Sequence, residues 1–207
     1  MKVIAINGSP KRDGNTAAVI QIMAEELICQ SIETEVIHVG LGPVRGCTDC
    51  RFCSSAGQRC AFNDDIVNEA SEKMRQADGI ILGSPVYYGG IAGTMKCFLD
   101  RVFFSGSSYF RGKVAAAFVT VRRSGGVTTV QQLLNYLQLA RTVSPPSQYW
   151  PAIHGGAPGE VLQDSEGMQT ARHMARDMGW LLKAIAVGEP MPEHEPREWT
   201  NFIRGSI

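Results

Sequence analysis

The sequence predicts an α/β fold, a doubly wound five-stranded parallel sheet with helices on both faces. Apolar, β-branched runs alternate with segments of helical period through most of the 207 residues. The strand-like runs are almost wholly apolar, which is typical of parallel strands covered on both faces. Neither an internal repeat nor a linker interrupts the alternation, so we expect one domain over residues 1–207.

In the first half of the chain, the elements follow from where the apolar residues fall. A β-branched run closed by Asn-Gly predicts an opening strand, and apolar residues on one helical face predict the helix after it. A stretch rich in glycine and cysteine shows no period, which predicts an inserted loop over residues 40–63. We expect a strand over residues 2–6, a helix over 15–28, a strand over 34–39 and, after the loop, a helix over 64–76.

The second half continues the same alternation. A short, wholly apolar run at residues 79–83 predicts a central strand. We expect further strands over residues 113–121 and, more weakly, 148–154, and helices over 94–102, 128–139 and 168–185. The tail over residues 188–207 is polar and rich in proline, and its Trp199 and Phe202 are expected in a surface strap or a contact between subunits.

Composition and charge exclude several classes of function. Twenty Lys and Arg residues balance twenty Asp and Glu residues, so no broad field attracts nucleic acid or an anionic membrane. No apolar run approaches the roughly 20 residues that span a bilayer, and no leader-like segment precedes the first strand. We therefore expect a cytoplasmic protein with neither nucleic acid nor a membrane as partner.

Ligands of doubly wound sheets bind beyond the carboxyl ends of the strands, which here means the loops after Ile6, Gly83 and Val121. The first loop reads GSPKRDGNT and places glycines, hydroxyls, an amide and two cations at a helix N-terminus, which favours a phosphate. It lacks the Gly-Lys-Ser/Thr of a nucleoside triphosphate loop, so a single phosphomonoester fits better. The alternative is an ordinary turn in which Asn15 or Thr16 caps the helix.

Two motifs carry a resemblance to a known family. GSPKRDGNT, followed later by GSPVYYGGIAGTMKCFLDR, resembles the NADPH-dependent FMN reductase group of flavodoxin-like proteins over nearly the whole chain. The resemblance implies a flavodoxin-like sheet and FMN as cofactor. Carried over position by position, it implies that the FMN phosphate is held by Ser9, Lys11, Arg12, Asn15 and Thr16.

The second loop has the composition that a flavin ring requires. An isoalloxazine needs a flat apolar or aromatic contact and backbone groups for its polar edge. Proline, tyrosine and glycine after the central strand supply both, and the resemblance implies the same role. The residues concerned are Pro85, Val86, Tyr87, Tyr88 and Gly89.

The third loop follows the strand over residues 113–121 and contains two arginines and two glycines. These suit the flavin edge or the phosphate of a nicotinamide donor, and a solvated basic turn is the alternative. Similar proteins use this loop against the flavin, which implies roles for Arg122, Ser124 and Gly125.

Other residues near these loops are expected to be structural. Asp100 and Arg101, adjacent at the end of a helix, are expected to form an ion pair with each other. Tyr149 and Trp150 are expected to pack in the core, with a contact to a flavin in a neighbouring subunit as the alternative.

Four cysteines crowd into fourteen residues: Cys47, Cys50, Cys53 and Cys60. Thiolates three and six positions apart can surround one centre if the backbone wraps around it, which is what an iron–sulfur cube requires. The spacing resembles that of the iron–sulfur flavoproteins, a branch of the same group in which a [4Fe-4S] cluster relays electrons to FMN. A zinc site and four reduced cysteines without metal remain alternatives.

Together these features predict an FMN-dependent oxidoreductase that takes electrons from NAD(P)H or reduced ferredoxin. We expect the protein to supply orientation and electrostatics, with no catalytic nucleophile or general base. An electron carrier that binds partner proteins is the alternative of another class, and a redox-sensing module is a weaker one. Similar proteins commonly cover the open flavin face from a second subunit, so we expect a homodimer or homotetramer.

Overall fold

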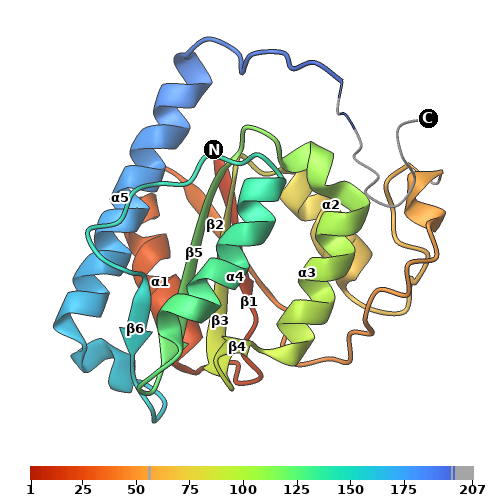
Figure 1. Cartoon of the computed structure of the whole chain (residues 1–207). Coiled ribbons are helices and arrows are strands. Elements are labelled where there is room, and N and C mark those ends of the chain that lie inside the picture. Colours follow the sequence, from red (N-terminus) through yellow and green to blue (C-terminus); the bar gives the residue numbers. More distant parts are fainter. Residues whose placement is uncertain (56, 197, 199–207) are drawn as a thin grey trace.

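The computed structural model describes residues 1–55, 57–196 and 198, and it contains a parallel sheet between two layers of helices (Figure 1). The sheet has the strand order β2-β1-β3-β5-β6, and each of these neighbouring pairs is parallel. This confirms the doubly wound five-stranded sheet. The strands are β1 (Lys2–Asn7), β2 (Glu33–His38), β3 (Gly79–Tyr87), β4 (Gly90–Ile91), β5 (Val114–Val121) and β6 (Ala152–His154).

The helices form two layers, one on each face of the sheet. Along β1 the buried side chains alternate, so Ile4 and Ile6 join one hydrophobic cluster while Val3 and Ala5 join the other. The first cluster includes residues of α2, α3 and α4, and the second includes residues of α1 and α5. The helices are α1 (Asn15–Ile28), α2 (Val67–Gln76), α3 (Gly93–Gly106), α4 (Gly126–Leu139) and α5 (Ser165–Val187).

The central strand runs four residues further than the apolar pattern predicts. β3 continues through Tyr87 and turns back into β4, with Val86 paired to Ile91. The two residues of the turn, Tyr88 and Gly89, have φ values of 50° and 72°. Positive φ at both positions is the backbone of a tight two-residue hairpin whose twist matches the strands. The second predicted loop is therefore largely a β-hairpin.

The last strand is shorter than expected. β6 begins at Ala152, so Tyr149 and Trp150 precede it, and their side chains are 61% and 59% exposed. Their rings stack on each other, with centroids 5.8 Å apart. The expectation that they pack in the core is wrong, because the chain reaches the sheet only after both residues.

The cysteine-rich segment over residues 40–63 lies beside α3 and α2 and is irregular apart from a short 3₁₀ turn, Phe52–Ser54 (Figure 1). The sequence predicts an inserted loop over this segment, of which residue 56 lies outside the described residues. Trp199 and Phe202, assigned from sequence to a strap or contact, also lie outside them. Within the described part of the chain, each helix is too short or too polar to cross a membrane.

Candidate functional site

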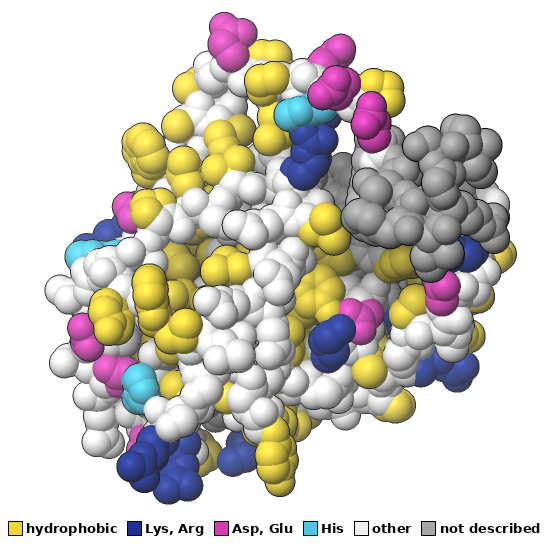
Figure 2. All heavy atoms as spheres, viewed as in Figure 1, with side chains coloured by type: hydrophobic (Ala, Val, Ile, Leu, Met, Phe, Trp, Pro, Cys, Tyr) yellow, Lys and Arg dark blue, Asp and Glu magenta, His cyan; other side chains and the backbone are white. Residues whose placement is uncertain are grey.

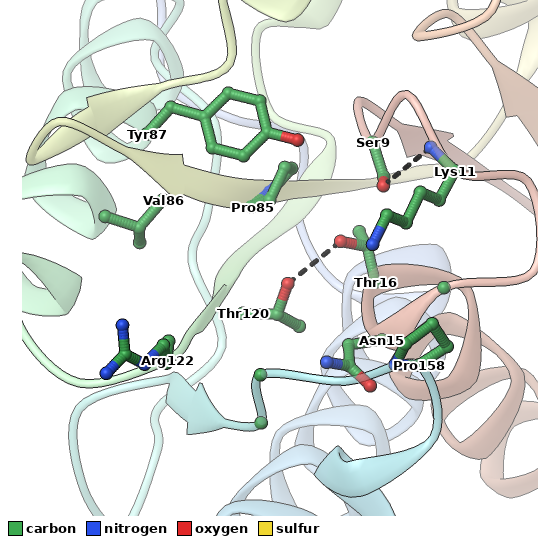
Figure 3. A pocket seen from close by; sticks show the side chains of 13 residues that line it. Ser9, Lys11, Asn15, Thr16, Pro85, Val86, Tyr87, Thr120, Arg122 and Pro158 are labelled. Carbon is green, nitrogen blue, oxygen red and sulfur yellow. Dashed lines mark hydrogen bonds between the residues drawn. The ribbon is translucent and has the colours of Figure 1, made fainter.

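The loops at the carboxyl ends of β1, β3, β5 and β6 enclose a pocket of about 140 Å³ (Figure 3). Eight residues predicted from the sequence line it: Ser9, Lys11, Asn15, Thr16, Pro85, Val86, Tyr87 and Arg122. Five predicted residues lie outside this lining: Arg12, Tyr88, Gly89, Ser124 and Gly125. The sheet thus brings the three predicted loops to one place, with a core of their residues facing a common space.

The first loop is held in shape by its own side chains and by β2. Asn7 Oδ1 accepts from the Ser9 N–H at 3.0 Å, and Ser9 Oγ accepts from the Lys11 N–H at 3.1 Å. From the end of β2, His38 Nε2 donates to the Ser9 carbonyl at 2.5 Å. A Cβ at Gly40 would overlap that same carbonyl, so this close approach requires glycine.

Helix α1 opens into the pocket without a side-chain cap. Its N-cap is Gly14, which has no side chain to cap the first N–H groups of the helix. Neither Asn15 nor Thr16, the caps of the alternative interpretation, is the N-cap: Thr16 Oγ1 bonds to Thr120 Oγ1 at 3.0 Å, and Asn15 Oδ1 accepts from the Gly159 N–H at 2.8 Å. The first N–H groups of a helix need an acceptor and favour an anion. Here they face the pocket lined by Ser9 and the other residues above.

The β3–β4 hairpin forms the opposite wall. Pro85, Val86 and Tyr87 line the pocket, whereas Tyr88 projects fully into solvent at the turn. Helix α4 braces this hairpin, because Gln132 Oε1 accepts from the Ile91 N–H at 3.2 Å. The wall therefore combines a flat proline face and an aromatic ring on a braced backbone.

The third loop packs against the hairpin at Gly125. Its φ is 87°, and a Cβ there would lie 2.9 Å from the Cα of Gly89 and 3.2 Å from Cγ1 of Val86. Gly125 and Gly89 therefore shape the site instead of lining it. Arg122 does line the pocket, while Ser124 is exposed.

Five lining residues were not predicted as site residues from the sequence: Gly14, Thr120, Gly155, Gly156 and Pro158. Thr120 had a signal, since it is a hydroxyl near the carboxyl end of an otherwise apolar strand. The two glycines directly follow β6, which also marks the carboxyl edge of the sheet. Glu160 shapes this last loop, because its carboxylate accepts from the N–H groups of Ala157 and Gly156, which lowers the pKa of Glu160.

The charge of the pocket suits a phosphate. Within the lining that the structure describes, Lys11 and Arg122 are cations and no carboxylate is present. Figure 2 shows Lys and Arg side chains gathered at the lower end of the molecule, where Figure 1 places the carboxyl ends of the strands. The exposed cations of the first and third loops are Lys11, Arg12, Arg122 and Arg123.

Comparison with known proteins identifies the group to which this fold and pocket belong. Residues 1–157 match the family described as NADPH-dependent FMN reductase. The chain belongs to this family. Its flavodoxin-like α/β fold and FMN-reductase membership, both expected from the two motifs, are confirmed. Membership assigns this FMN reductase homologue a flavin-dependent oxidoreductase or electron-transfer role.

Curated relatives of this FMN reductase homologue carry related names. An iron–sulfur flavoprotein of Methanocaldococcus jannaschii is 36% identical over 197 residues, covering 89% of this chain and 99% of the relative. An iron–sulfur flavoprotein of Methanosarcina thermophila is 30% identical over 190 residues, covering 89% and 97%. A putative NAD(P)H-dependent FMN-containing oxidoreductase of Bacillus subtilis is 24% identical over 187 residues, covering 85% and 97%.

Solved structures share the fold of this FMN reductase homologue at low sequence identity. RosB with a bound flavin-phosphate intermediate has a TM-score of 0.69 at 17% identity, covering 99% of this chain and 94% of RosB. A flavodoxin from the domain Archaea has a TM-score of 0.59 at 16% identity, covering 88% and 99%. At such identities the likeness extends to the architecture alone.

The four cysteines of this FMN reductase homologue form a second candidate site. Cys47, Cys50, Cys53 and Cys60 line one cavity, whose wall also includes Arg101 from α3. Burial raises the pKa of the Cys53 thiol, and the charges of Cys60, Cys47 and Cys50 raise it further. Across the described residues, no three side chains of Cys, His, Asp or Glu are grouped so that they could hold a single metal ion. Four thiols around a shared cavity are the donor set of an iron–sulfur cube.

Arg101 does not pair with its neighbour in sequence. Its guanidinium forms an ion pair with Asp65, whereas the Asp100 carboxylate accepts from Lys96 Nζ at 2.5 Å and from the Tyr136 hydroxyl. The expected Asp100–Arg101 pair is wrong, because adjacent residues of a helix point in directions about 100° apart. Arg101 faces the cysteine segment and Asp100 faces α4.

Proposed function

We propose that this protein is an FMN-dependent oxidoreductase that draws electrons from NAD(P)H or reduced ferredoxin and passes them through FMN to an acceptor. The observation that carries the proposal is the uncapped N-terminus of α1, which opens into the pocket at the carboxyl ends of the strands. Membership of the FMN reductase family supports it.

In this proposal the three loops divide the binding of FMN among them. The N–H groups at the start of α1, Ser9 and Lys11 hold the phosphate, which the helix dipole further stabilises. Pro85 and Tyr87 offer flat surface to the ring, and Arg122 places a positive charge beside it. Bound FMN would supply exchange between two-electron and one-electron transfer. The protein orients the cofactor, and we assign no side chain as nucleophile or general base.

We further propose that Cys47, Cys50, Cys53 and Cys60 hold a [4Fe-4S] cluster that exchanges electrons with FMN. Two observations support this: the four thiols surround one cavity, and relatives at 30% to 36% identity are named iron–sulfur flavoproteins. Anaerobic purification followed by iron and sulfide analysis tests it. Cluster-loaded protein contains both, whereas zinc or no metal would contradict the assignment.

A binding experiment tests the phosphate site. Removing the charge in Lys11→Ala takes away one charge-assisted hydrogen bond, worth roughly 1.5–3 kcal/mol, so the Kd for FMN should rise at least tenfold. Riboflavin lacks the phosphate, and its Kd should hardly change. Lys183→Ala is the matched control, since this exposed lysine of α5 is absent from the pocket lining. Equal losses for FMN and riboflavin would contradict the assignment of the phosphate to this loop.

A turnover experiment separates the enzyme from the carrier. The FMN-loaded protein is mixed anaerobically with NADPH, NADH or reduced ferredoxin, and flavin bleaching is followed by stopped-flow absorbance. Steady oxidation of a nicotinamide supports the oxidoreductase. Reduction only by ferredoxin, with re-oxidation only by another protein, would instead support an electron carrier. The fully exposed Tyr88, beside the pocket wall, would suit a contact with such a partner protein.

A further inference from the structure

Arg101 is an unusual side chain for the interior of a protein. It lies in the middle of α3, and only 1% of its surface is exposed, which makes it the largest of the fully buried side chains in the described structure. Arginine is almost never fully buried without a partner, because removing its charge from water costs several kcal/mol. Its surroundings must therefore supply compensating contacts.

Those contacts all come from the cysteine-rich segment over residues 40–63 and from Asp65, which follows it. Besides the ion pair with Asp65, Nη2 donates to the carbonyl of Phe62 at 3.1 Å and Nη1 points to the carbonyl of Arg45 at 3.4 Å. The remaining nitrogen, Nε, donates to Sγ of Cys60 at 3.2 Å. One side chain of α3 thus contacts the segment on both sides of the cysteine run.

Cys60 is also held through its backbone. Asn68 of α2 accepts from the Cys60 N–H at 3.0 Å and donates to the Cys60 carbonyl at 3.1 Å. With its peptide groups bound by Asn68 and its sulfur bound by Arg101, Cys60 is anchored to two helices. Cys47 and Cys50, by comparison, are exposed.

Stability alone is a poor reason for this arrangement. A buried ion pair is often no better than apolar side chains of similar volume, because desolvation offsets the attraction. The pair with Asp65 would neutralise the guanidinium without any bond to sulfur. The bond from Nε to Cys60 is therefore an additional feature, and it is directed at one of the four cavity-lining thiols.

We propose that Arg101 is a positioning residue of the cysteine centre, fixing the Cys60 sulfur and donating a charge-assisted hydrogen bond to it. This inference rests on the proposed cluster. Hydrogen bonds to ligand sulfurs and nearby positive charge favour the reduced, more negative form of an iron–sulfur centre. Arg101 accordingly raises the reduction potential of the centre and keeps its fourth ligand in place.

The test compares wild type with Arg101→Lys, which keeps the charge but loses the planar fork and its directed Nε–H. Potentials are measured by redox titration monitored by electron paramagnetic resonance on anaerobically reconstituted protein. We expect the equilibrium constant for reduction of the centre to be about tenfold smaller in the variant. Its reduction potential is then about 59 mV lower for a one-electron couple. We also expect less iron per chain and an unchanged Kd for FMN, which reports that the sheet is folded.

Two further variants make the comparison specific. Arg59→Lys makes the same exchange in the same segment, at an exposed arginine that bonds to Asn63, and should behave as wild type. Asp65→Asn removes the ion pair but leaves the bond to sulfur, so it should lower stability while moving the potential less than Arg101→Lys does.

A measurement on wild type covers the case in which Arg101→Lys fails to fold. Protein labelled with ¹⁵N-arginine should show nitrogen coupling to the reduced cluster in electron–nuclear double resonance, and Arg51→Lys should retain it. No coupling, or a wild-type potential in Arg101→Lys, would overturn this inference while leaving the cluster in place. Wild-type protein that takes up no iron would overturn the proposed relay as well.

Discussion

Gly125 provides the sharpest test of how the third loop shapes the pocket. Its φ of 87° lies in the left-handed region, and the Cβ of Gly125→Ala would stand 2.9 Å from the Cα of Gly89. Ordinary contact begins at 3.4 Å, so the loop or the β3–β4 hairpin must move by about 0.5 Å. Because that hairpin carries Pro85 and Tyr87, the shift displaces the wall of the pocket.

Two costs are expected, and they can be measured separately. Left-handed backbone with a Cβ costs about 1–2 kcal/mol, and the overpacking adds about 1–3 kcal/mol, so the free energy of unfolding should fall by about 2–5 kcal/mol in total. Displacing the wall should make the free energy of FMN binding less favourable by about the net contribution of one hydrogen bond, about 0.5–1.5 kcal/mol. The Kd for FMN should therefore rise roughly two- to twelvefold, measured by quenching of flavin fluorescence.

Gly112→Ala separates these two costs. Gly112 has a similar φ of 77°, but its Cβ would meet only Met191 Sδ at an ordinary 3.5 Å, and it precedes β5 at the other end of that strand. It should lower stability by the backbone cost alone and leave FMN affinity unchanged. If Gly125→Ala binds FMN as wild type does, or if both variants lose the same affinity, the argument from contact with the hairpin is refuted.

Three further predictions concern stability and assembly. Burial and the bond to Asp100 raise the pKa of Tyr136 to about 12, so the neutral phenol is favoured in the fold. The free energy of unfolding should fall between pH 10 and 12, and urea titrations of Tyr136→Phe should show a flatter decline there. Asp164 caps α5 by accepting from the Gly167 N–H at 2.9 Å, so chemical denaturation of Asp164→Ala should reveal a loss of about 1–2 kcal/mol. If the exposed Trp150 contributes to a homodimer or homotetramer, Trp150→Ser should lower the mass found by light scattering; an unchanged oligomer would assign the contact elsewhere.

Local sequence patterns were sufficient to predict segments whose buried residues recur at regular intervals along the chain. Helix α1 has the predicted bounds because its apolar residues recur every three or four positions and all meet the same sheet face. The apolar run at residues 79–83 marks a central strand because both of its faces are covered. The first loop could be predicted to line the pocket because its residues are nearly consecutive in the sequence.

Contacts between distant segments could not be read in this way. Tyr88 adopts positive φ in the turn of a hairpin that also contacts α4, where Gln132 accepts from the Ile91 amide 41 positions away. Thr120 reaches the pocket only because β5 lies beside β3, which brings it to Thr16. Nothing in the local sequence around any of these residues encodes such partners.

The same division applies to the chemistry. Residue types and spacing were enough to predict a doubly wound sheet, a first loop that lines the pocket and a group of four thiols around one cavity, since each of these is a periodic or contiguous feature. Which loop residues face the pocket, and that Arg101 binds Asp65 and Cys60 in place of Asp100, depended on three-dimensional packing. The physical reason is that a buried charge takes whichever partners the packed helices bring within hydrogen-bonding distance, and sequence adjacency does not specify them.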